Sequence, residues 1–90
     1  MNKKTATKIL NETGHENIAH VSMKPGQFVE EHSHAWDVDL IILSGSLQIN
    51  VNKNSKILIA GDRFKLDKNI IHSEYAGMEG VTFLSARPQK

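Results

Sequence analysis

The feature that most limits the possible folds is a repeated alternation, along the whole chain, of short β-favouring runs and turn residues. The clearest run is segment 47–52, in which Leu, Ile and Val alternate with Gln and Asn, as in a strand with one wet face. Many short strands separated by glycine turns favour a β-sandwich or a β-barrel. We therefore predict an all-β fold. The one helix candidate, KTATKIL at 4–10, could equally form an edge strand.

Length and composition indicate a single globular domain over residues 1–90. A chain of this size builds one modest core, so a ligand site must lie inside that core or in a cleft. With 39% apolar residues and a net charge of +1, the chain offers nothing that attracts nucleic acid or an anionic membrane, and we expect neither as a partner. No segment approaches the roughly 20 apolar residues of a membrane span, and the start lacks a secretory pattern. We expect a cytoplasmic protein.

Histidines at positions 32 and 34 follow a run that is predicted to be extended. Side chains two residues apart on a strand share a face, so His32 and His34 would converge there, whereas on a helix they would diverge. A third histidine, His72, lies in a later β-favouring run, IIHSEY, near the end of the second half of the chain. The alternative is that the acidic segment EEHSH is simply a solvated loop. The pair alone does not decide between a metal site and such a loop.

The two halves of the chain resemble the two sequence motifs of the cupins. The first motif, G-x5-H-x-H-x(3,4)-E-x6-G, is similar to residues 26–45, with matches at Gly26, His32, His34 and Gly45. The second motif, G-x5-P-x-G-x2-H-x3-N, is similar to residues 61–76, with matches at Gly61 and His72. The two motifs occur in the family's order and are separated by a short spacer. That combination is more specific than either motif alone.

This resemblance implies a single cupin-type jelly-roll β-barrel in which His32, His34 and His72 bind a divalent metal inside the lumen. The chain contains no cysteine, so a metal would be held by imidazole, carboxylate and water. Such donors suit Fe, Mn, Ni, Zn, Co or Cu, and the sequence does not select one of them.

Val38 occupies the position of the glutamate that usually completes the cupin metal site. Asp39 fits the longer spacing of the motif and is our alternative fourth ligand. Strand alternation, however, would turn Asp37 and Asp39 away from the face of Val38, unless a β-bulge re-aims one of them. Asn69 stands where the second motif has glycine, and asparagine tolerates the left-handed conformation that a glycine there would supply.

Glu74 lies two residues after His72 and would share its face of the strand. It could bind the metal or act as an acid/base beside it, and we name it as the candidate catalytic residue. A glutamate on a polar face is the competing interpretation.

Three further side chains have two interpretations each. Trp36 could wall a ligand cavity or belong to a core or a dimer interface. Arg63 and Arg87 could each bind an anionic substrate or be ordinary surface charges.

We expect a metal-dependent cupin that acts on a small polar metabolite. The alternative is a barrel that binds or senses a small, sugar-like ligand without turnover. We also expect a homodimer, for which Ile41 and Leu43 could supply a surface if Leu40 and Ile42 point inward.

Overall fold

The computed structural model describes residues 1–88, so the last two residues of the predicted domain, 89–90, lie outside the described part. In this described part of the chain, one helix precedes six strands. The elements are α1 (Lys3–Glu12), β1 (Ile18–Met23), β2 (Phe28–His32), β3 (Val38–Val51), β4 (Asn54–Ile59), β5 (Arg63–Leu66) and β6 (His72–Ala86). The predicted predominance of strands is confirmed. Within residues 1–88, no helix is long and apolar enough to cross a membrane.

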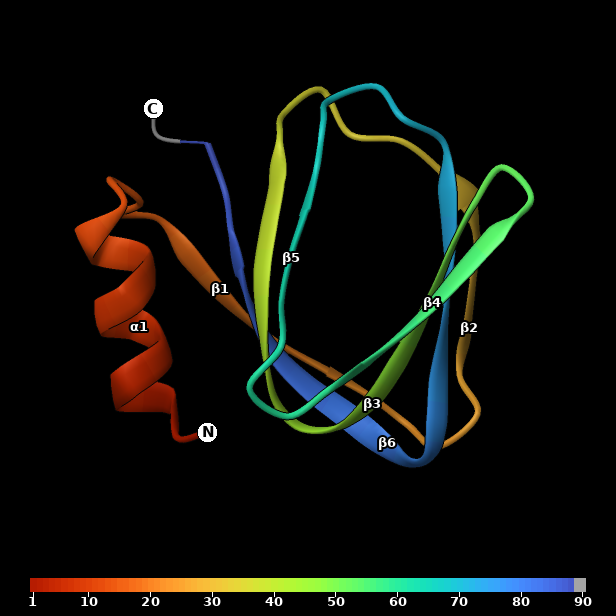
Figure 1. The fold of residues 1–90 in the computed structure, drawn as a ribbon, viewed down its shortest axis with the longest axis horizontal. Helices are drawn as coiled ribbons and strands as arrows, with labels where there is room; N and C mark the ends of the chain where they lie inside the picture. Colours follow the sequence, from red (N-terminus) through yellow and green to blue (C-terminus); the bar gives the residue numbers. More distant parts are fainter. Residues whose placement is uncertain (89–90) are drawn as a thin grey trace.

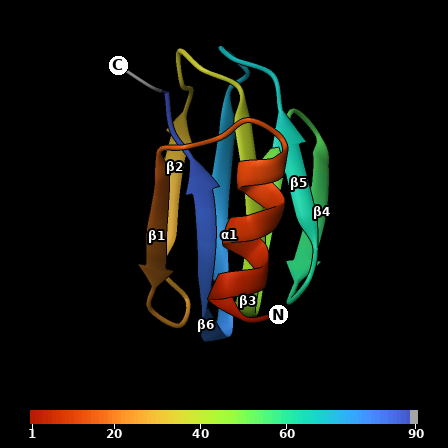
Figure 2. The same cartoon turned by 90° about the vertical axis from the view of Figure 1, so that its left-hand side faces the viewer.

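The initial segment forms a helix and not an edge strand. The side chain of Asn2 caps it by accepting a hydrogen bond of 2.8 Å from the Thr5 amide. Ala6 and Leu10, four residues apart, lie on one face and are fully buried. They pack on Ile41 of β3 and Leu84 of β6, and Figure 2 shows α1 in front of these two strands and running along them. Burial of this stripe explains why the segment is helical.

The six strands form one antiparallel sheet built around the two longest, β3 and β6. The main strand order is β1-β6-β3-β4, while β2 pairs with β6 and β5 pairs with β3. Figure 1 shows how the strands curl around a common interior with the helix outside. The predicted all-β jelly-roll fold is confirmed, although in the described residues no strand pair closes the curled sheet into a complete barrel. The long strands β3 and β6 each bend, which carries both halves of the sheet around the core.

The bend is located where Gly45 of β3 approaches Gly80 of β6. The β3–β6 register shifts on both sides of Ser44 and Gly45. Both glycines have positive φ, 77° and 75° respectively. A methyl group on Gly45 would collide with the carbonyl oxygen of Gly80, so the approach requires glycine.

Residues of β3 alternate between two separate cores. Val38, Leu40 and Ile42 face the interior of the curl, together with residues of the other strands. Ile41 faces outward and is covered by α1, and Leu43 packs beside it. Leu40 and Ile42 do point inward, but the outward surface we expected to serve a dimer is filled by the chain's own helix.

Candidate metal centre

Three histidines from two distant parts of the chain meet at one end of the curled sheet. His32 ends β2 and pairs across the sheet with His72, the first residue of β6, while His34 follows in the loop after β2. Potential ligand atoms of all three lie within 4.8 Å of one another. The ring centroid of His32 lies 4.3 Å from that of His72 and 4.9 Å from that of His34. The structure thus brings the three motif histidines together.

Backbone carbonyls fix the rings of His32 and His72. Nδ1 of His32 lies 2.7 Å from the carbonyl oxygen of Glu30, and Nδ1 of His72 lies 2.9 Å from that of Ile70. A carbonyl only accepts, so each Nδ1 must carry the proton and donate it. In the neutral tautomer that carries its proton on Nδ1, Nε2 keeps a free lone pair, which is the arrangement found in metal-binding histidines.

The two loops that carry the site are joined to each other. The Asn69 amide donates a hydrogen bond of 2.7 Å to the carbonyl oxygen of His34, and the Lys68 amide donates one of 2.9 Å to the Asp37 carboxylate. Asn69 has a φ of 65°, so the predicted left-handed conformation is confirmed. Together these contacts hold the loop with His34 against the loop that leads into His72.

His34 stacks on Trp36 and also contacts the rings of His32 and His72. Its ring lies 4.7 Å from that of Trp36 at an interplanar angle of 30°. Burial, followed by the charges of His32, His72 and Arg87, lowers the pKa of His34 below its usual value. The ring is therefore neutral at physiological pH, and neutral imidazole is the form that binds metals.

A cavity of about 220 Å³ opens beside the histidines. Apolar residues of the inner core form much of its wall. Its polar lining residues other than the histidines are Ser22, Gln27, Glu74, Ser85 and Arg87. Glu74 Oε2 lies 3.6 Å from Nε2 of His32, and the Glu74 side chain is 13% exposed. The predicted acid/base residue thus shares the cavity with the histidine cluster.

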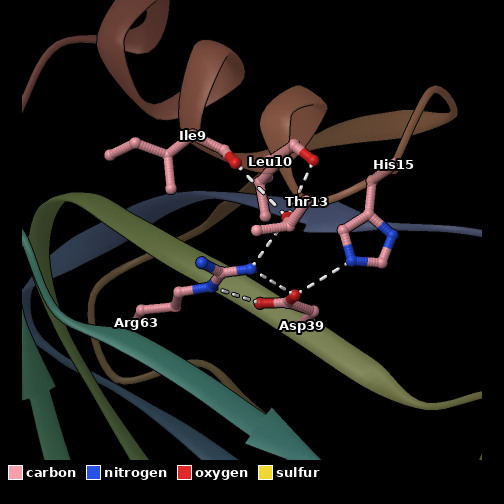
Figure 3. Close-up of polar contacts among 6 residues, drawn as sticks. All are labelled: Ile9, Leu10, Thr13, His15, Asp39 and Arg63. Carbon is pink, nitrogen blue, oxygen red and sulfur yellow. Dashed lines mark hydrogen bonds and ion pairs between the residues drawn. The ribbon is translucent and has the colours of Figure 1, made fainter.

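Asp39 lies apart from this cluster, on the other face of β3. Its carboxylate accepts hydrogen bonds of 2.9 and 2.7 Å from Arg63, and its Oδ2 lies 2.9 Å from Nε2 of His15 (Figure 3). Arg63 also donates to Thr13, which follows α1. Since Val38 and Leu40 face the interior, regular alternation sends Asp39 toward the helix, without the bulge that a ligand role needed.

Burial alone would raise the pKa of Asp39, but hydrogen bonds and charge from Arg63 and His15 outweigh it and hold the pKa below its usual value. This cluster joins the end of α1 to strands β3 and β5. Its role in the structure is therefore to fasten the helix to the sheet.

Val38 is buried in the inner core and brings no oxygen to the site. The placement of Arg87 was left open by the sequence, and the structure puts it on the cavity wall. The alternation of side chains along a strand could have predicted this placement, because Phe83, Ser85 and Arg87 are spaced two residues apart and line the same cavity.

No family model matches this sequence, and no curated protein matches it. Solved structures do. A cupin-2 domain-containing protein from Shewanella frigidimarina superposes with a TM-score of 0.71 and 25% identity, over 80% of this chain and 69% of that one. A cupin superfamily protein from Desulfitobacterium hafniense superposes with a TM-score of 0.69 and 25% identity, over 76% of this chain and 62% of that one. An RmlC-like cupin from Shewanella frigidimarina superposes with a TM-score of 0.69 and 20% identity, over 81% of this chain and 66% of that one. A substantial part of each of those longer chains is unmatched.

Proposed function

The chain is a small protein of the cupin superfamily, and from its histidine cluster we propose that it binds a divalent metal ion through His32, His34 and His72. The observation that carries the proposal is the convergence of three imidazoles within 4.8 Å. Two of the rings are already oriented by their Nδ1 hydrogen bonds. Three neutral nitrogen donors suit Fe, Mn, Ni, Co, Cu or Zn and leave coordination positions open.

We further propose that the protein is an enzyme acting on a small polar metabolite held in the adjoining cavity. A bound divalent ion would supply Lewis-acid activation of a ligand oxygen or of a water molecule. Glu74 is the carboxylate on the cavity wall and lies beside His32, so it can accept or return a proton within the site. Seryl and glutaminyl side chains on the wall can orient a polar ligand.

A non-catalytic barrel that binds or senses a small, sugar-like ligand is the alternative. The observation that favours it is the valine at position 38, which removes the carboxylate usual in cupins from this part of the site. Glu74→Gln separates the two proposals, because it keeps the shape of the side chain but cannot exchange protons. If the protein is an enzyme, this variant loses turnover and keeps ligand affinity.

Metal content is the first test. Protein purified without a histidine tag is analysed for metals, and wild type is compared with the double variant His32→Ala, His72→Ala. We expect near-stoichiometric metal in wild type and none in the variant. His20→Ala is the matched control, because His20 is an exposed histidine of β1 outside the cluster. The metal site would be refuted if wild-type protein contained no metal after purification and also failed to bind added Zn²⁺, Ni²⁺ or Mn²⁺.

A further inference from the structure

The two arginines that the sequence leaves open have opposite environments. Arg63 is neutralised, since it makes two hydrogen bonds to the Asp39 carboxylate. Arg87 directly follows β6 and lines the same cavity as the three histidines. Among residues 1–88, no carboxylate forms a salt bridge with Arg87. Within the described residues, the guanidinium beside the candidate metal centre is therefore not in contact with a carboxylate, whereas the one beneath the helix is.

Arg87 is held in place by three contacts. Its amide donates a hydrogen bond of 2.7 Å to the carbonyl oxygen of Asn17. Its Nη1 donates one of 2.8 Å to the hydroxyl of Ser85, which is buried. The guanidinium carbon lies 5.8 Å from the centre of the Trp36 ring, which also stacks on the ring of His34. An arginine restrained in this way loses little freedom when it binds a ligand.

The charges of the cavity also favour an anion. Apart from the histidines, its charged lining residues are Glu74 and Arg87, which offset each other. Neutral histidines with a bound divalent ion would leave the cavity with a net positive charge. A guanidinium has five N–H donors in a planar fork that matches a carboxylate. Among residues 1–88, the Ser85 hydroxyl is the one group that accepts a hydrogen bond from the guanidinium of Arg87.

We propose that Arg87 binds the carboxylate of a small organic acid whose remaining oxygen groups point to the three-histidine site. This inference rests on the proposed function and adds the substrate class to it. A cavity of about 220 Å³ is smaller than the pockets that bind drug-sized molecules, so it suits a compact acid of metabolite size. Arg87 is then the residue that selects acids over neutral molecules of the same shape.

Calorimetric titration of the Zn²⁺-loaded protein tests the proposal with three probes: malonate, its uncharged analogue malonamide, and inorganic phosphate. We expect malonate to bind wild type, and Arg87→Gln to weaken that binding about tenfold to hundredfold, the loss expected for hydrogen bonds to a charged group. Arg87→Lys should recover part of the affinity, because it restores the charge without the fork. Binding of malonate near Arg87 should also change the fluorescence of Trp36, the only tryptophan.

Lys8→Gln is the control, since it removes one positive charge from the exposed side of α1. It should leave malonate affinity unchanged. Equal malonate affinity in wild type and Arg87→Gln would overturn the proposal, as would malonamide binding as tightly as malonate, or an Arg87-dependent preference for phosphate. Zn²⁺ affinity is measured separately on the same proteins. Failure of wild type to bind Zn²⁺ counts against the metal site, whereas unchanged Zn²⁺ binding without Arg87-dependent malonate binding counts against this inference alone.

Discussion

His32 and His72, 40 positions apart in sequence, face each other across strands β2 and β6 with ring centroids 4.3 Å apart. Each donates its Nδ1 proton to the carbonyl of the residue two positions earlier in its own strand or loop. The same local device is thus used once in each half of the chain. It aims two imidazole nitrogens at one point before any ligand arrives, which lowers the entropic cost of binding there.

Metal binding should therefore stabilise the fold. A ligand that binds only the native state at 100 times its Kd adds about 2.7 kcal/mol. For a domain of this size, each kcal/mol raises Tm by roughly 4–8 °C, so saturating Zn²⁺ should give a clear upward shift in a thermal melt. His34→Ala should abolish the shift, because one of three donors is gone.

The control for this prediction is again His20→Ala, which should melt with the same Zn²⁺-dependent shift as wild type. An equal shift in His34→Ala would mean that zinc stabilises the protein at another place. Melts with Mg²⁺ provide a second comparison, since Mg²⁺ prefers oxygen donors and should have little effect.

Asp39→Asn should lower the free energy of unfolding without affecting metal binding. The substitution leaves Arg63 without its carboxylate partner, and we expect a loss of about 1–3 kcal/mol at pH 7, measured by urea denaturation. Because Arg63 and His15 lower the pKa of Asp39 in the folded state, its ionised form contributes stability above the unfolded pKa of about 3.9, and this contribution is lost as pH falls through the folded value. The difference between wild type and variant should therefore shrink in acid.

The exposed carboxylate of Asp67 provides the comparison, since Asp67→Asn should change stability little at either pH. Zinc titration of Asp39→Asn completes the test. Weaker Zn²⁺ binding in this variant would restore Asp39 as a candidate metal ligand, despite its position beneath the helix.

Gly45→Ala should be strongly destabilising. A non-glycine residue at positive φ costs about 1–3 kcal/mol, and here the added methyl group would also collide with the Gly80 carbonyl. Gly61→Ala is the matched comparison, because Gly61 also has positive φ but open space around the added atom. The difference between the two variants in chemical denaturation reports the collision alone. Equal losses would show that the strands do not need this close approach.

The histidine cluster could be predicted because one part of it is local in sequence and the other part follows from the resemblance to a family. The H-x-H spacing predicts that His32 and His34 share one face of an extended segment, and the resemblance to the two cupin motifs implies that His72 joins them. Asn69 could be predicted in the same way, from the conformation that its position in the turn requires.

The role of Asp39 depends on the packing of α1 on the sheet, which could not be predicted from the sequence. Segment 4–10 has no decisive helical pattern, and it becomes a helix because Ala6 and Leu10 find an apolar surface on β3 and β6. Because α1 covers the outward face of β3, Asp39 is buried there and its carboxylate needs hydrogen-bond partners. Arg63 and His15 supply them. The failure to close the barrel likewise depends on which strands pair, and local patterns do not encode that.

Homodimer formation stays a prediction, and the surface available to it is the outer face of the sheet opposite the inner core. Phe28, Tyr75, Gln48 and Ile57 are aligned across β2, β6, β3 and β4 in register. Phe28, Tyr75 and Ile57 are 52%, 47% and 64% exposed. A shallow hollow along this row is lined only by uncharged residues, among them Met78, which is 95% exposed. Exposed apolar surface of this kind favours association. In a two-fold symmetric dimer, the patch of one copy would pack against the same patch of the other copy.

Ile57→Lys tests this surface, because in a two-fold dimer both copies would bury a lysine charge in the contact. We expect wild type to be a dimer at micromolar concentration by light scattering, and Ile57→Lys to be a folded monomer. Ile71→Lys makes the same chemical change at a residue of similar exposure, 59%, in the loop before β6, and should stay dimeric. A wild-type monomer would refute the dimer, whereas a dimeric Ile57→Lys variant would assign the contact to another face.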